Sequence, residues 1–230
     1  MENLRQARLS RGWSQKEAAR RLGVSQAYVA MLESGLRRLT PALARKAMRV
    51  YGLSPTVLPA AEPFRLAQSV SAQGLAEQLA VLGYPGFAYL RPHVAKKNPG
   101  EVLLAALAQD ELEARLVEAL PWLLLRYWDV DVNWVVEQAK RRDLQNRLGF
   151  LAGLTRRLSE AAGAPNQNRN RALAELEAAL EKSRLAQEGT FCKTPGTDTE
   201  REWLRENRPE EAKHWNLLTD WRAEHLRYVA

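Results

Sequence analysis

Residues 14–35 read SQKEAARRLGVSQAYVAMLESG, and this stretch predicts two short helices joined by a tight turn. Ser14 is suited to the N-cap of the first helix, and Glu17 lies three positions later as its capping-box partner. Gly23 supplies the left-handed residue with which such a helix ends. Ser25 is suited to the N-cap of the second helix. The stretch therefore predicts a compact pair of helices with a fixed crossing.

The second helix has an apolar face and a mostly polar face. Val29 and Leu32, three positions apart, are expected to face inward. The N-terminal residues of the second helix of a helix-turn-helix reach base edges in the major groove of DNA. A glutamine can form two hydrogen bonds with adenine, and an alanine or methionine can contact the thymine methyl group. The residues expected on the outward face are Gln26, Ala27, Tyr28, Met31 and Ser34.

Polar residues around the two helices are suited to the phosphate backbone, which positions a protein on DNA. Gln15 can offer its amide and a helix-terminal N–H to a phosphate, and Arg37 and Arg38 follow the second helix. The full set expected to contact DNA is Gln15, Lys16, Ser25, Gln26, Ala27, Tyr28, Met31, Ser34, Arg37 and Arg38.

On these residues the chain resembles the Cro/lambda-repressor (XRE) family of DNA-binding domains over residues 2–58. The resemblance implies an upstream helix over 3–11, a fourth helix that starts at Thr40 and Pro41, and a four- to five-helix domain. It also implies that Arg8 pairs with Glu33, and we interpret this pair as structural rather than as a DNA contact. The implied partner is a double-stranded DNA operator, bound by a homodimer.

The distribution of charge agrees with this resemblance. Residues 1–50 contain 11 Lys and Arg against three acidic residues, a net charge of +8. The remaining 180 residues hold 23 basic and 24 acidic groups, so the excess positive charge of the chain, +7 in total, lies in the candidate DNA-binding domain. Attraction to phosphates requires such a concentration of charge.

The composition limits the other classes of protein. One cysteine, Cys192, cannot form an internal disulfide and favours a reducing, cytoplasmic compartment, nucleoid-associated in a prokaryote. The longest apolar stretch is too short to cross a bilayer, and we expect no membrane association. We also expect no cofactor and no metal, because His93, His214 and His225 are scattered and no glycine-rich phosphate loop is present.

Behind the first domain (1–58) we predict a linker over 59–71, which is rich in proline at its start, and an all-α body over 72–230 for dimerisation or partner binding. A helical pattern runs over 102–120 and is interrupted at Pro121. No pattern typical of strands stands out. The other predicted helices span 72–82, 134–140, 144–158, 171–185, 199–206 and 210–227.

The body holds six of the seven tryptophans. Core packing is the simpler interpretation of such residues, and a partner surface is the alternative, since tryptophan is enriched at interfaces. Trp215 and Trp221 lie in the terminal segment and are our candidates for partner binding.

The predicted function is sequence-specific regulation of transcription, in its simplest form repression by a dimer. Within this class we favour an antitoxin that neutralises a protein toxin through its helical body and represses its own operon, because the segment 120–158 weakly resembles such regulators. Two alternatives stay open. The first is a regulator whose body senses a small molecule near residues 84–89 and 122–134. The second is an enzyme with a regulatory DNA-binding domain, although no nucleophile–base pair supports it.

Overall fold

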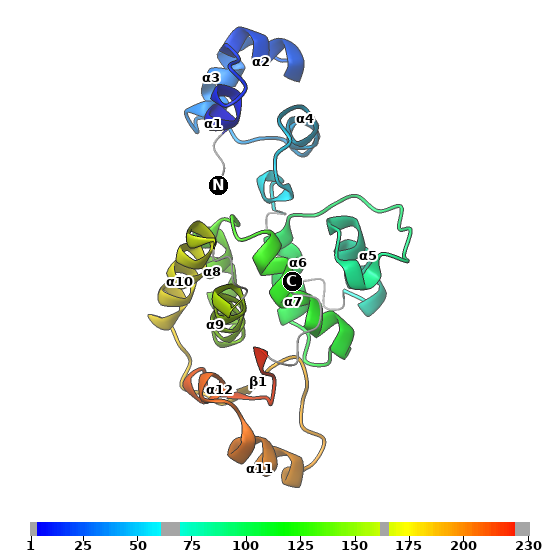
Figure 1. Cartoon of the computed structure of the whole chain (residues 1–230), viewed down its shortest axis with the longest axis vertical. Helices are drawn as coiled ribbons and strands as arrows, with labels where there is room; N and C mark the ends of the chain where they lie inside the picture. Colours follow the sequence, from blue (N-terminus) through cyan, green and yellow to red (C-terminus); the bar gives the residue numbers. More distant parts are fainter. Residues whose placement is uncertain (1–3, 61–69, 162–165, 224–230) are drawn as a thin grey trace.

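The computed structural model of the chain describes residues 4–60, 70–161 and 166–223. Helices dominate, as predicted, and they gather around two hydrophobic cores. The smaller core belongs to an N-terminal domain at the top of Figure 1, and the larger core belongs to the body below it. The fold is therefore all-α in two parts.

The first four helices form the N-terminal domain: α1 Leu4–Leu9, α2 Gln15–Leu22, α3 Gln26–Glu33 and α4 Pro41–Tyr51. The fourth helix starts as expected, since the hydroxyl of Thr40 accepts from the backbone N–H of Leu43 and Pro41 follows at N1. Ala18, Ala19 and Ala47 in the core are small enough for the helices to pack closely.

A short neck, residues 54–58, joins the N-terminal domain to the body and contains the 3₁₀ turn η1 Pro55–Val57. The hydroxyl of Thr56 donates to Asp129 Oδ2 at 2.7 Å. Asn98 Nδ2 donates to the carbonyl oxygens of Thr56 (3.1 Å) and Leu58 (2.6 Å). These hydrogen bonds hold the neck against the body. The predicted linker over 59–71 therefore follows a segment that is fixed in position. Residues 61–69 lie outside the described part of the chain.

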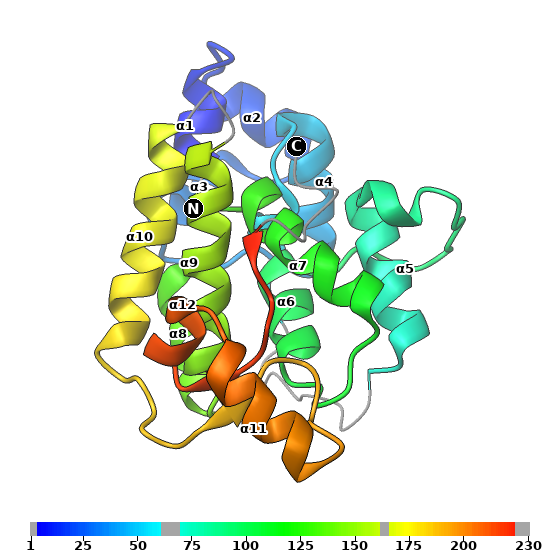
Figure 2. The same ribbon diagram turned by 60° about the horizontal axis from the view of Figure 1, so that its bottom comes forward.

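The body consists of α5 Ala72–Leu82, η2 Pro85–Phe87, α6 Pro99–Leu107, α7 Ala114–Arg126, α8 Val132–Lys140, α9 Gln145–Ala161, α10 Gln167–Glu181, α11 Asp198–Asn207 and α12 Glu210–His214. At its centre lies α9, in which every residue from Leu148 to Thr155 is buried. Figure 2 shows α10 along one side of α9, and α7 also contacts α9. Helix α9 therefore organises the packing of the body.

The prediction of a single helix over 102–120 that is interrupted at Pro121 is wrong, because two helices, α6 and α7, occupy this region and the second continues past Pro121. Helix α6 ends at Leu107. Arg147 on α9 donates to the carbonyl oxygens of Leu107 (2.7 Å) and Gln109 (3.2 Å), and so provides hydrogen-bond partners for carbonyl groups that the end of a helix leaves unpaired. The predicted interruption at Pro121 does not occur, since α7 continues through it. Burial of the leucines on both sides of Pro121 offsets the cost of a proline inside a helix, about 3 kcal/mol.

The later helices also differ from the prediction in their bounds. Helix α10 starts at Gln167 rather than at 171, because the side chain of Asn166 caps it there. It ends at Glu181 rather than at 185, and the backbone of Leu185 forms hydrogen bonds with the side chain of Asn146 instead. The helix predicted over 210–227 ends at His214. A left-handed residue, Asn216, follows it.

Two strands of two residues each, β1 Gly189–Thr190 and β2 Leu217–Leu218, pair in parallel. This pairing was not predicted, and strands this short carry little sequence signal. Residues 224–230, where the last predicted helix ends, lie outside the described part.

The prediction of Trp215 as a partner-binding residue is wrong. Its side chain is 1% exposed and lies against α9 at Gly149, where an added Cβ would collide with the indole ring. A side chain enclosed in this way belongs to the core and offers no surface to a partner. Trp221 is half-buried against the same core, and its role in partner binding stays a prediction.

Cys192 lies in the body core, and burial raises the pKa of its thiol to about 12. Because the thiolate is the reactive form, we expect the native protein to resist alkylation by iodoacetamide at pH 8, and the same protein in denaturant to react within minutes. Mass spectrometry of the two samples provides the measurement. Rapid labelling of the native protein would contradict the buried position.

In the described part of the chain, we find no helix that combines the length and the apolar character required to span a membrane.

Candidate nucleic-acid interface

The start of α2 is fixed by Ser14, whose Oγ accepts from the backbone N–H of Glu17 at 3.1 Å. The carboxylate of Glu17 does not serve as the predicted capping-box partner. It accepts instead from Arg20 (2.8 Å) and Arg21 (2.7 Å) on the exposed side of the helix, and the bond from Arg20 lowers the pKa of Glu17. The N-cap prediction is confirmed, and the second half of the capping box is wrong.

The turn between α2 and α3 depends on Gly23, which has φ 68° and donates its N–H back into the last turn of α2. An added Cβ at Gly23 would also lie 2.7 Å from Nζ of Lys46. Ser25 then caps α3 by accepting from the backbone N–H of Tyr28 at 3.1 Å. The turn thus sets the direction in which α3 leaves α2.

The outward face of α3 is arranged largely as predicted. Gln26 and Ala27 at its N-terminal end are exposed, whereas Tyr28 and Met31 are half-buried. Ser34 is exposed and donates its hydroxyl to the carbonyl of Met31 at 3.2 Å. The N-terminal end of α3 therefore presents an amide and a methyl group to solvent, which are suited to base edges.

The predicted pair of Arg8 and Glu33 is present. Arg8 Nε and Nη2 donate to the two carboxylate oxygens of Glu33 at 2.6 and 3.0 Å, and the two side chains are only 9% and 4% exposed. Arg8 Nη1 also donates to the carbonyl of Trp13 at 2.8 Å. The pair joins α1, the loop before α2 and the end of α3, which is a structural role.

Gln15 belongs to the same network. Its Nε2 donates to Glu33 Oε2 at 3.1 Å, so its amide has a protein partner. Hydrogen bonds from Arg8, above all, and from Gln15 hold the pKa of Glu33 below its ordinary value. Sequence reasoning placed Gln15 at a phosphate and missed this bond. Neighbouring Lys16 is exposed.

The two ends of α3 have different surroundings. Ser34, Arg37 and Arg38 line a cleft of about 760 Å³ whose far wall includes Trp134 and Glu137 of α8 in the body. Gln26 and Ala27 do not line this cleft. The N-terminal end of α3 thus lies outside this cleft, whereas the C-terminal end borders it.

Comparison with known proteins decides the nature of this domain. Residues 4–58 match a family model described as helix-turn-helix. The N-terminal domain is a Cro/lambda-repressor-like helix-turn-helix domain. Neither a search of curated proteins nor a search of solved structures found a match to the chain. The helix-turn-helix domain covers about a quarter of the chain, and the chain is a DNA-binding transcriptional regulator.

Arginines also flank the aromatic side chain that precedes the helix-turn-helix motif. The guanidinium carbons of Arg21 and Arg11 lie 4.2 and 5.7 Å from the centre of the Trp13 ring, and Trp13 packs on Tyr51 with ring centroids 5.5 Å apart. Cation–π contacts of this kind hold exposed arginines in place. The sequence signal for them was Gly12-Trp13 directly before the motif.

Two acidic residues of the body, Asp129 and Asp131, have structural partners. Asp131 caps α8 by accepting from the backbone N–H of Trp134 at 3.1 Å, and Asp129 accepts from Thr56 in the neck. Among the described residues, no group of three or more His, Cys, Asp or Glu side chains is placed to hold a metal ion.

Proposed function

We propose that the chain is a sequence-specific repressor that reads its operator with the N-terminal end of α3. The observation that supports this most strongly is the exposure of Gln26 and Ala27 at that end, on a helix fixed by the buried pair of Arg8 and Glu33. An interface that specifies sequence needs such a rigid support, because base contacts tolerate little displacement.

The phosphate contacts in this proposal come from the flanks of the motif. Lys16 at the start of α2 and Arg37 after α3 are exposed and lie on either side of the N-terminal end of α3 in the sequence. Ser25 and Ser34 each have a backbone partner, and their exposed hydroxyls can still accept or donate once more. These residues would position the domain, and Gln26 and Ala27 would specify bases.

We further propose that the repressor acts as a homodimer, because a single four-helix domain covers only one half-site. Two half-sites would lie about 34–36 Å apart on one face of the duplex. Selection from a pool of randomised duplexes tests both parts of the proposal. We expect enrichment of a palindrome whose half-sites are about 10 base pairs apart. Failure to enrich any sequence would overturn sequence-specific repression, and enrichment of a single half-site would overturn the dimer.

The antitoxin hypothesis concerns the body, and it requires a protein partner. A supporting feature is α11, which has no buried residue and carries Trp203 with 51% of its surface exposed. Tryptophan at such a position is typical of interface anchors. Co-expression with the adjacent open reading frame provides the test. Relief of growth arrest by this chain supports the hypothesis, and an adjacent frame without toxicity overturns it.

Arg37 provides a separate prediction about phosphate contacts. Arg37→Ala should weaken binding to all duplexes alike and should reduce the slope of log K against log salt by about 1, because one phosphate contact is lost. Fluorescence anisotropy at a series of salt concentrations measures the slope. Arg141→Ala, directly after α8, removes an exposed arginine paired with Glu137; it is the matched control and should leave the slope unchanged. An unchanged slope for Arg37→Ala would remove Arg37 from the interface.

A further inference from the structure

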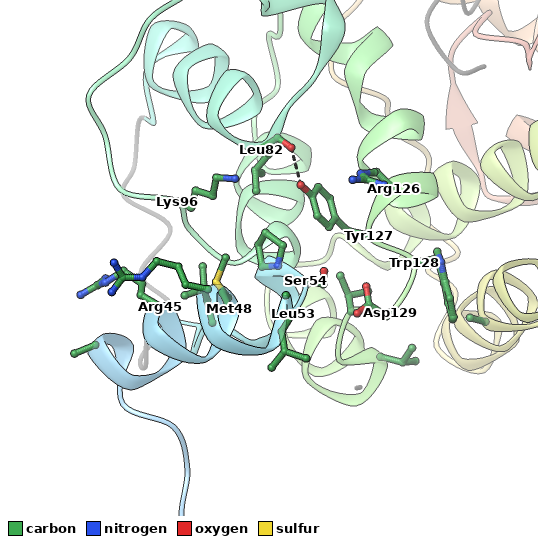
Figure 3. A pocket seen from close by; sticks show the side chains of 18 of the residues that line it. Arg45, Met48, Leu53, Ser54, Leu82, Lys96, Arg126, Tyr127, Trp128 and Asp129 are labelled. Carbon is green, nitrogen blue, oxygen red and sulfur yellow. Dashed lines mark hydrogen bonds between the residues drawn. The ribbon is translucent and has the colours of Figure 1, made fainter. Parts of the chain in front are cut away.

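A second and larger cleft lies beside the neck. It has a volume of about 1510 Å³ and separates α4 of the helix-turn-helix domain from the segment after α7 in the body (Figure 3). One wall therefore belongs to the DNA-binding domain and the other to the body. A ligand pocket at a junction of domains is a common arrangement.

Basic side chains surround this cleft. Arg45 and Arg49 come from α4, Lys96 from the segment before α6, and Arg126 from the end of α7. Among the described residues, Arg45, Arg49 and Lys96 have no acidic side chain within 4.0 Å. Two of the basic residues of the N-terminal domain thus face the body rather than the reading face of α3.

The acidic side chains of the cleft are fewer and already engaged. Asp129 accepts from the hydroxyl of Thr56, and Glu175 on α10 lies 3.9 Å from Arg171. Four cationic groups against two acidic groups give the lining an excess positive charge. Unpaired cations of this kind attract a carboxylate, a sulfonate or a phosphate.

The body wall of the cleft is rigid and partly aromatic. The hydroxyl of Tyr127 donates to the carbonyl of Leu82 at 2.6 Å, drawn as the dashed line in Figure 3. Behind it, Tyr127 packs on Trp122 with ring centroids 6.1 Å apart, and Trp122 packs on Tyr84 at 5.3 Å. Trp128 and Met48 add further apolar surface to the lining. A preformed apolar wall beside cations suits a ligand with both an apolar and an anionic part.

We propose that this cleft binds a small organic anion with an aromatic or aliphatic part, and that its occupancy changes operator affinity. The anionic group lies between Arg45, Arg49 and Lys96, and the apolar part lies on Tyr127 and Trp128. Because the two walls belong to different domains, an occupant favours one placement of the helix-turn-helix domain relative to the body. The regulatory part of this inference rests on the proposed function, whereas the binding part does not.

The binding part is tested with 8-anilinonaphthalene-1-sulfonate, an aromatic anion that fluoresces in apolar surroundings, on the full chain. We expect saturable one-site binding that phenyl phosphate or benzoate displaces, which also separates a preference for phosphates from one for carboxylates. The double variant Arg45→Ala/Arg49→Ala should weaken the binding at least about tenfold, since hydrogen bonds to charged groups are lost. Arg141→Ala/Arg201→Ala removes the same charge from positions directly after α8 and on α11, neither of which lines the cleft, and should bind normally.

Near-ultraviolet circular dichroism shows whether each variant is folded, and Lys96→Ala provides a second variant from the body side should the double variant not fold. Equal affinity of native chain and folded cleft variants would overturn the site. For the regulatory part, operator affinity is measured with and without a saturating concentration of whichever compound, phenyl phosphate or benzoate, displaces the dye. Binding with an unchanged operator affinity would overturn the regulation alone, and intact ligand binding without any operator binding would overturn the proposed function instead.

Discussion

We expect Arg8→Met to lower the free energy of unfolding of the helix-turn-helix domain by about 3 kcal/mol. The substitution keeps most of the aliphatic stem but removes the two hydrogen bonds that Arg8 donates to the carboxylate of Glu33, which is 4% exposed. An uncompensated buried charge is costly because neither water nor a counter-ion can reach it. Urea unfolding followed by far-ultraviolet circular dichroism measures the change.

The matched control is Arg20→Met, since Arg20 also pairs with a glutamate but is 76% exposed. The unfolding midpoint of this variant should not change, because exposed ion pairs contribute little to stability. Equal midpoints for Arg8→Met and the native chain would show that the buried pair does not support the domain.

The same pair predicts a dependence on pH. The folded-state pKa of Glu33 is lowered, chiefly by the bond from Arg8. The stabilisation is therefore fully present above the unfolded pKa of a glutamate, about 4.3. It is lost as the pH falls through the lower folded value, because the unfolded state then binds the proton first. In Arg8→Met this part of the acid sensitivity should be missing.

The second large effect concerns the body. Trp215→Ala should lower the free energy of unfolding of the body by about 3–5 kcal/mol, because it removes a side chain that is 1% exposed and leaves a cavity against α9. Gly149→Ala should also destabilise the body, since the new methyl group would meet the Trp215 ring. Denaturant unfolding monitored by circular dichroism measures both variants.

Trp203→Ala is the control for this experiment, because Trp203 is 51% exposed on α11 and no core surrounds it. We expect its midpoint to match that of the native chain. A small effect of Trp215→Ala, similar to that of Trp203→Ala, would mean that Trp215 lies at the surface, where it could bind a partner.

Local chemistry explains why the site could be predicted from the sequence. Ser14, Ser25 and Thr40 cap their helices through bonds to residues three positions away, and Gly23 requires only its own backbone conformation. These features need no knowledge of the rest of the chain. The pair of Arg8 and Glu33 was available only through the family resemblance, because 25 positions separate the two residues.

The predictions from sequence are wrong where residues far apart in the chain determine the local structure. Arg147 ends α6 from 40 positions away, and Asn146 pairs with the backbone of Leu185 from 39 positions away. Neither bond leaves a signal in the helical periodicity. The burial of Trp215 likewise depends on Gly149, a residue on a different helix. The two clefts beside the neck arise from the docking of one domain on the other, which no single motif encodes.

The central claim is that the N-terminal end of α3 specifies the operator. The most direct measurement is the ratio of affinities for the selected operator and for a scrambled duplex, compared between the native chain and Gln26→Ala at one salt concentration. We predict that Gln26→Ala lowers operator affinity by about 5- to 150-fold, or 1–3 kcal/mol, and leaves affinity for the scrambled duplex unchanged. An unchanged ratio, or an equal loss on both duplexes, would contradict it.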